Sequence, residues 1–150
     1  MKILFVCTGN SCRSVMASYY LKKRLLDLKI NNNIEVLSAG VSTIAGMFAS
    51  SEVIEILKKE GIDATFHYSK GLSKDMIESS NLIFVMSHNH LNEIIRRVPT
   101  SKNKVFLLDK EDISDPINGA MEDYEKCFNL IKKAIENNVI PKIEKSLMVS

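Results

Sequence analysis

The sequence predicts a doubly wound α/β fold, a three-layer sandwich in which a four-stranded parallel sheet is flanked by helices. Short β-rich apolar segments alternate with segments whose apolar residues recur every three or four positions. This alternation implies right-handed crossovers and a parallel sheet that is covered on both faces. The 150 residues are 45% hydrophobic and 25% charged, as expected of one domain with its own core. Ligands of such folds bind at the carboxyl ends of the strands.

Four segments are predicted strands, and each is short and apolar with a polar or glycine-containing turn nearby. They are Lys2–Cys7, Ile34–Ala39, Leu82–Met86 and Val105–Leu108. Leu82–Met86 is apolar throughout, which is typical of a strand buried on both faces. We expect Asn31-Asn32-Asn33 to form the turn before the second strand.

Helices are predicted between these strands from apolar spacing and from end signals. Ser14–Leu28 carries apolar residues at intervals of three and four, so they share one face. Ser50–Glu60 is a second helix that Gly61 stops. Ser73 is a predicted N-cap, because its side chain can accept a hydrogen bond from an exposed amide of a short helix.

The last third of the chain adds two more predicted helices. Leu91–Val98 has a helical stripe that Pro99 ends, and Tyr124–Ile135 marks a long final helix. Beyond Pro141 the pattern weakens, and we expect a poorly ordered tail.

Composition excludes several classes of protein. The formal net charge of +2 favours neither nucleic-acid nor membrane binding. The longest apolar runs are too short to span a bilayer, and the run at Ile3–Cys7 is too short for a signal peptide. We therefore expect a cytoplasmic protein. An odd number of cysteines, three, predicts reduced thiols rather than a disulfide framework.

The segment Cys7-Thr8-Gly9-Asn10-Ser11-Cys12-Arg13-Ser14 has the features of an anion-binding loop. Gly9 permits positive φ and Asn10 tolerates it, so consecutive backbone N–H groups can point inward. The helix that follows adds its positive N-terminal dipole. The planar fork of Arg13 can hold two phosphoryl oxygens. We expect the remaining loop residues to bind the substrate: Thr8, Gly9, Asn10, Ser11, Cys12 and Ser14.

The same field stabilises a thiolate, so Cys7 is the predicted nucleophile, with Ser14 close enough to donate to its sulfur. A bare Cys-x5-Arg pattern occurs often by chance, and Cys7 would then be an ordinary buried residue at a strand end. Gly, Asn and Ser within the loop, placed between a strand and a helix, favour the functional interpretation.

Phosphoryl transfer to a thiolate also needs an acid for the leaving group. Asp115 is the candidate, because Pro116 stiffens the loop and biases Asp115 toward an extended conformation. Asp109 and Asp112 lie nearby in the sequence, and the alternative is that all three are solvated loop acids.

The cysteine motif, Asp115-Pro116 and the chain length together resemble the low-molecular-weight protein tyrosine phosphatase family, nearly end to end. The resemblance implies a phosphotyrosine phosphatase I-like fold and one phosphatase domain over residues 1–150. It implies that Cys7 is the nucleophile, that Arg13 binds phosphate and that Asp115 is the general acid and base. It also implies a hydrogen-bond network that supports the loop, formed by Asn10, Ser14, Ser38 and His67.

The resemblance further implies phosphorylated protein substrates and no metal or other cofactor. The sequence does not determine the oligomeric state, and we expect a monomer. His88 and His90 have no cysteine or pair of acids beside them, and we expect both to be surface residues.

Several positions depart from the family pattern. Val15 and Ser18 stand where the family usually has proline and glutamate. Ile117 and Asn118 stand where tyrosine-specific members commonly carry aromatic residues, and Ser11 where they tend to have a bulky aliphatic one. The bacterial protein-arginine phosphatases, a branch of this family, also have a small hydroxyl residue there. This favours phosphoarginine over phosphotyrosine.

Two other functions fit parts of the sequence. A thioredoxin-coupled arsenate reductase shares this fold and a nearly identical loop, but it passes a disulfide along cysteines after the third strand. Met86–Val98 has no cysteine, and Cys127 borders the apolar face of the final helix. A non-catalytic phosphate-binding module is the second alternative.

Cys12 allows two interpretations. It lies in the same loop as Cys7 and could trap an oxidised Cys7 as a reversible disulfide. Alternatively, it packs beneath the loop.

Overall fold

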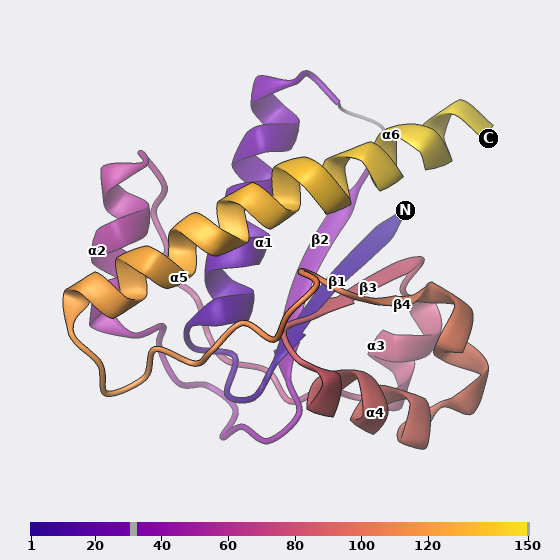
Figure 1. Cartoon of the computed structure of the whole chain (residues 1–150), viewed down its shortest axis with the longest axis horizontal. Coiled ribbons are helices and arrows are strands. Elements are labelled where there is room, and N and C mark those ends of the chain that lie inside the picture. Colours follow the sequence, from indigo (N-terminus) through magenta and orange to yellow (C-terminus); the bar gives the residue numbers. More distant parts are fainter. Residues whose placement is uncertain (31–32, 150) are drawn as a thin grey trace.

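The structure, a computed structural model, describes residues 1–30 and 33–149 and confirms the predicted three-layer architecture (Figure 1). Four parallel strands form a sheet in the order β2-β1-β3-β4. The strands are β1 (Lys2–Cys7), β2 (Glu35–Gly40), β3 (Leu82–Val85) and β4 (Val105–Leu107). The helical elements are α1 (Arg13–Asp27), α2 (Ser51–Lys59), α3 (Lys74–Ser79), α4 (His88–Arg97), η1 (Pro99–Lys104), α5 (Met121–Ala134), η2 (Ile135–Val139) and α6 (Ile140–Val149).

The strand order places a topological switch point at the end of β1. β2 pairs with one side of β1, and β3 pairs with the other. At the carboxyl edge Cys7 lies opposite Gly40, and Val6 lies opposite Val85. The chain therefore leaves β1 where the connections diverge, which is where such folds bind ligands.

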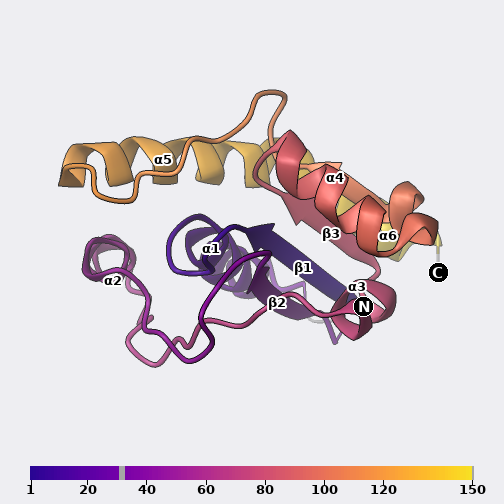
Figure 2. The ribbon, with the colours of Figure 1, turned by 90° about the horizontal axis from the view of Figure 1, so that it is seen from below.

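The side chains of β1 alternate between two hydrophobic cores. Ile3 and Phe5 pack with α1, α2, α5 and α6, whereas Leu4 and Val6 pack with α3 and α4. All four are fully buried, as expected of a strand covered on both faces. Figure 2 shows the loop that follows β4 running along α5, so it reaches back toward the end of β1.

The predicted elements agree with the structure, with ends that differ by up to three residues. Ser73 caps α3 and accepts a hydrogen bond from the Met76 N–H at 3.1 Å, as predicted. Of the predicted turn Asn31-Asn32-Asn33, the first two residues lie outside the described residues, and Asn33 has a positive φ of 55°.

The prediction of a poorly ordered tail after Pro141 was wrong, because α6 continues the helix to Val149. Five residues of π-helix, Ile135–Val139, end two positions before this proline. Proline lacks the N–H that an interior helical position would use, and a π-bulge changes the hydrogen-bond register there. Ile140 and Ile143 are buried and extend the apolar face of α5. In Figure 1, α5 and α6 form one rod across the molecule. Within residues 1–30 and 33–149, no helix is long and apolar enough to cross a membrane.

Gly40, the last residue of β2, lies against the segment that follows β1. A Cβ atom there would be 2.4 Å from the Thr8 carbonyl oxygen and 3.0 Å from the Asn10 nitrogen. Both of these are backbone atoms, so a rotamer change cannot relieve the contact. The absence of a side chain at Gly40 lets the sheet support this segment directly.

We predict that Gly40→Ala lowers the free energy of unfolding by about 1–3 kcal/mol, because the backbone must move to admit the methyl group. Gly71 forms an isolated β-bridge with Gly40, and a Cβ there would meet nothing within 4 Å. Gly71→Ala is therefore the matched control and should change stability by less than about 1 kcal/mol. Urea unfolding measures both. Equal effects of the two substitutions would contradict the close approach.

Candidate active site

The segment Cys7–Ser14, here called the cysteine loop, curls between β1 and α1. Cys7 ends the strand, and Arg13 begins the helix. Asn10 has φ of 55°, a left-handed conformation that asparagine adopts more readily than most residues. The Asn10 N–H donates to Cys7 Sγ at 3.3 Å, so the loop folds back onto its own first side chain.

Asn10 is fully buried, and its polar groups are all hydrogen-bonded. Its Nδ2 donates to Ser14 Oγ at 2.8 Å, and its Oδ1 accepts from the Lys70 N–H at 2.9 Å. Its carbonyl lies 2.9 Å from His67 Nε2. A carbonyl only accepts, so this ring nitrogen carries the proton. These bonds attach the loop to the segment that follows α2.

Ser14 lies 2.9 Å from Cys7 Sγ. Because Ser14 Oγ already accepts from Asn10 Nδ2, its hydroxyl hydrogen is free to donate to the sulfur. Cys7 is 2% exposed, and Ser14 is fully buried. The sulfur thus receives one backbone and one side-chain donor at the N-terminus of α1.

Arg13 connects the cysteine loop to the loop after β4. Its Nη1 donates to the Ile113 carbonyl at 2.8 Å, and its Nη2 lies 3.4 Å from Asp115 Oδ2. Nη2 also donates to Thr8 Oγ1 at 3.3 Å. The guanidinium is 6% exposed and the Asp115 side chain 36%, so the carboxylate sits at the solvent-facing rim. The structure therefore brings Cys7, Arg13 and Asp115 to one edge of the sheet.

The prediction that His90 is a surface residue was wrong. His90 is 4% exposed, with Nε2 2.9 Å from Thr8 Oγ1 and Nδ1 3.0 Å from Ser87 Oγ. Ser87 also caps α4, which turns the ring inward. The sequence does contain a pattern that could have indicated this position. Ser87-His88-Asn89-His90 follows β3 at the carboxyl edge of the sheet, and a serine that caps a helix lies beside the residue three positions later. His88 is exposed, as predicted, and binds Asp112 at 2.7 Å.

The environment of His90 disfavours the imidazolium. Burial lowers the pKa of His90 to about 4, and the positive charge of Arg13 acts in the same direction. His90 is therefore neutral at neutral pH and can both donate and accept. It links Thr8 to Ser87 without placing a second positive charge beside Arg13.

The other two cysteines are free and buried. Cys12 Sγ lies 2.9 Å from Ser50 Oγ, and burial raises the pKa of this thiol. Burial also raises the pKa of Cys127 to about 12. Cys127 packs in the hydrophobic core, as predicted. The disulfide between Cys7 and Cys12 stays a prediction.

Of the residues expected to support the loop, His67 contacts it and Ser38 does not. Ser38 is 5% exposed, yet its hydroxyl has no hydrogen bond to any residue within 1–30 and 33–149. Its strand pairs it with Phe5 rather than with the loop, two residues short of the carboxyl edge. The remaining loop residues are held through backbone: Gly9 accepts from Thr43 Oγ1 at 2.6 Å, and Ser11 accepts from the Ser50 N–H at 3.1 Å.

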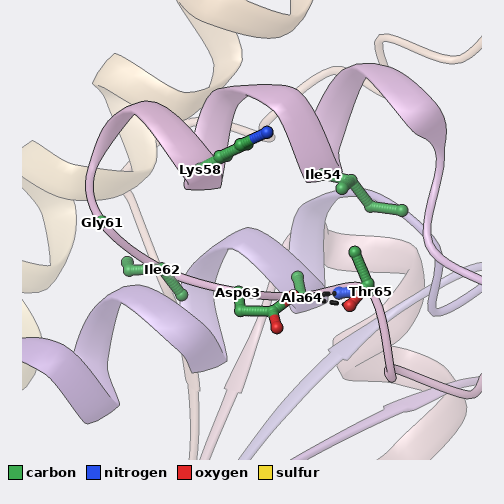
Figure 3. A pocket seen from close by; sticks show the side chains of 7 residues that line it. All are labelled: Ile54, Lys58, Gly61, Ile62, Asp63, Ala64 and Thr65. Atoms are coloured by element: carbon green, nitrogen blue, oxygen red, sulfur yellow. Dashed lines mark hydrogen bonds between the residues drawn. The ribbon is translucent and has the colours of Figure 1, made fainter.

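One hollow of the surface lies apart from this edge. Figure 3 shows this hollow, in which Ile54 and Lys58 of α2 face the segment Gly61–Thr65. None of its lining residues belongs to the cysteine loop or to the loop after β4. In the part of the chain that the structure describes, no three side chains gather as a metal-binding cluster.

Comparison with known proteins agrees with this geometry. The sequence profile described as low molecular weight phosphotyrosine protein phosphatase matches residues 2–148. The chain belongs to this family.

Members with different named activities resemble the chain to similar degrees. A protein-arginine-phosphatase of Geobacillus stearothermophilus is 36% identical, covering 90% of this chain and 91% of that protein. The crystal structure of the low molecular weight protein tyrosine phosphatase of T. tengcongensis is 34% identical, with a TM-score of 0.85 over 91% of this chain and 95% of its own. A YwlE arginine phosphatase variant with a phosphorylated active-site serine in place of cysteine is 28% identical, with a TM-score of 0.83 over 93% and 98% of the two chains. Membership of this phosphatase family thus leaves the choice of phosphorylated residue to the details of the site.

We predict that His90 makes the folded protein less stable in mild acid. Its pKa is about 4 when folded and about 6.5 when unfolded, so between these values the unfolded chain binds more protons. The contribution of neutral His90 to the free energy of unfolding is fully present above pH 6.5 and is lost as the pH falls toward 4. Between pH 7.5 and 4.5, wild type should lose about 2 kcal/mol more unfolding free energy than His90→Gln. Urea unfolding at the two pH values measures this, and equal losses would contradict it.

Proposed function

We propose that this chain is a single phosphatase domain over residues 1–150 that removes phosphate from phosphoarginine on proteins, through a phosphocysteine on Cys7. The observation that carries the proposal is the convergence of Cys7, Arg13 and Asp115 at one edge of the sheet. Ser14 and the Asn10 N–H both contact the sulfur, and Arg13 lies beside Asp115. Nucleophile, phosphate ligand and proton donor are thus within reach of one phosphoryl group.

In the first step the Cys7 thiolate attacks phosphorus, and the bond from phosphorus to the leaving group breaks. The inward N–H groups of the cysteine loop and the Arg13 fork bind the phosphoryl oxygens. Asp115 gives its proton to the departing guanidine nitrogen, or to the phenol oxygen of a phosphotyrosine. Its place at the solvent-facing rim suits a group that meets the leaving group rather than the phosphate.

In the second step Asp115, now ionised, takes a proton from water. The water oxygen bonds to phosphorus, the bond from sulfur to phosphorus breaks, and inorganic phosphate leaves. Cys7 returns as thiolate, stabilised by the Ser14 hydroxyl. One carboxylate thus serves as acid and then as base.

The walls of the site support phosphoarginine. Ser11 places a small hydroxyl residue in the loop, and Ile117 and Asn118 follow Asp115-Pro116 in place of aromatic residues. A phosphoguanidinium is planar and rich in hydrogen-bond donors, so a nearby hydroxyl suits it better than a methyl group.

We predict that Cys7→Ser loses all turnover of p-nitrophenyl phosphate, phosphotyrosine peptide and phosphoarginine peptide. Asp115→Ala should lower kcat about 10²–10⁴-fold, because the leaving group loses its acid. Asp109→Ala is the matched control, an acid of the same loop that bonds the adjacent Lys110 N–H, and should keep wild-type turnover. The wild-type preference between the two peptides tests the substrate. Wild type inactive on all three compounds would contradict the phosphatase, and arsenate reduction would then be assayed.

We predict that Ser11→Ile shifts the preference toward phosphotyrosine, because an apolar wall favours an aromatic ring and cannot bond a guanidinium. The ratio of kcat/KM for phosphoarginine peptide to that for phosphotyrosine peptide should fall by about tenfold or more. Ser11→Thr keeps the hydroxyl and should keep the ratio. An unchanged ratio in Ser11→Ile would mean that Ser11 does not select the substrate.

A further inference from the structure

A second hollow is lined by His67 and Lys70, both of which are hydrogen-bonded to Asn10 of the cysteine loop. Its volume is about 180 Å³, roughly six times the ~30 Å³ that one water occupies in the liquid. Helix α1, strand β2 and the segment Phe66–Lys70 form its walls. The polar side chains that line it are Ser18, Tyr19, Lys22, Ser38, His67, Tyr68 and Lys70. The proposed reaction uses none of these side chains directly.

The charges in this hollow are positive and lack a carboxylate partner. In the part of the chain that the structure describes, neither Lys22 nor Lys70 forms a salt bridge; the lysines that do are Lys23, Lys59, Lys126 and Lys132. No aspartate or glutamate is among the residues that line the hollow.

The two ammonium groups also influence each other and the histidine. Partial burial and the charge of Lys70 lower the pKa of Lys22. Burial lowers the pKa of His67, and Lys70 and Lys22 lower it further. Two cations held near a buried histidine leave a positive potential that an anion would relieve.

Ser38 gives a second, independent indication of a ligand. It is 5% exposed, and its hydroxyl bonds no residue within 1–30 and 33–149. In those residues every fully enclosed side-chain nitrogen or oxygen has a partner, so Ser38 Oγ keeps some access to solvent, and Ser38 lines the hollow. An almost buried hydroxyl without a protein partner is available to donate to a bound group.

We propose that this hollow is a second binding site for a small oxyanion of the phosphate class, held by Lys22, Lys70 and Ser38. The site is coupled to the cysteine loop through backbone: the Lys70 N–H donates to Asn10 Oδ1, and the Lys70 carbonyl accepts from the Gly40 N–H. His67 donates to the Asn10 carbonyl from the same wall. An anion bound there would hold this wall in place and thereby stabilise the loop.

Ser18 offers a way to imitate the anion within the chain. It is almost fully buried, lines the hollow, and stands where the family usually has glutamate. A glutamate at this position of α1 would bring a carboxylate to Lys22 and Lys70. We therefore expect Ser18→Glu to compete with an added oxyanion.

The test must separate this hollow from the cysteine loop, which also binds phosphate. Alkylation of Cys7 with iodoacetate, checked by mass spectrometry, places a carboxymethyl group in the loop. The alkylated protein is then titrated with inorganic phosphate, and the ring signals of His67 are followed by NMR. We expect saturable shifts that persist after alkylation. Lys22→Met or Lys70→Met should weaken the affinity about tenfold or more, and Ser18→Glu should abolish the shifts.

Lys23→Met is the matched control, because Lys23 neighbours Lys22 in α1 but binds the Glu60 carbonyl instead. It should keep wild-type affinity. Loss of the His67 shifts on alkylation, or equal weakening by Lys23→Met, would overturn the proposal. Methylphosphonate serves as a second probe. Similar affinities for phosphate and methylphosphonate would support the proposed site and indicate that its ligand can be an organic phosphate. Binding of phosphate but not of methylphosphonate would support the site and indicate that its ligand is the free phosphate ion. None of these readouts needs turnover, so they stand apart from the proposed reaction.

Discussion

The conformation of Asn10 is the constraint on which the rest of the site depends. A left-handed residue within a loop is stable only when its surroundings fix it. Here the side chain and the backbone of Asn10 bond four different partners: Cys7, Ser14, His67 and Lys70. Because these bonds are buried, losing one leaves an unsatisfied polar group as well as a looser loop. The same residue thus shapes the cradle and orients the hydroxyl that faces the sulfur.

Arg13 performs a comparable task between two loops. One nitrogen of its guanidinium holds the Ile113 carbonyl, while the other faces Asp115. The distance between nucleophile and acid is therefore set by a side chain that, in the proposed reaction, also binds the phosphoryl group. The Ile113 N–H donates to the Met86 carbonyl at the end of β3, so the acid-bearing loop is anchored to the sheet as well. A substrate phosphate that draws Arg13 toward itself also acts on the position of Asp115.

Local features were predictable from the sequence, and contacts between distant segments were not. The strand end, Gly9-Asn10 and the start of α1 lie within a few residues of one another, and local backbone chemistry is sufficient to indicate the cysteine loop. The inward position of His90 depends on Ser87 and on Thr8, 82 positions away. The hollow that contains Lys22, Ser38 and Lys70 is lined by side chains from α1, β2 and the segment after α2. These residues are far apart in the sequence, so no spacing in the sequence indicates the hollow. The helix after Pro141 was not predicted because a π-helical segment precedes it. This segment shifts the apolar residues out of the spacing of 3.6 residues per turn by which an α-helix is found in a sequence.

The hydrogen bonds of the cysteine loop also have a consequence for biosynthesis. Cys7 and Arg13 leave the ribosome well before the partners that shape their loop, which are at positions 67, 70 and 113. During that interval a nascent chain carries its reactive cysteine without the buried network that surrounds it later. Since chains emerge at roughly 5–20 residues per second, this interval lasts several seconds. The surroundings of the nucleophile are assembled only after the loop that follows β4 has been made, so fragments that end before this loop would carry an unsupported thiol rather than a catalyst.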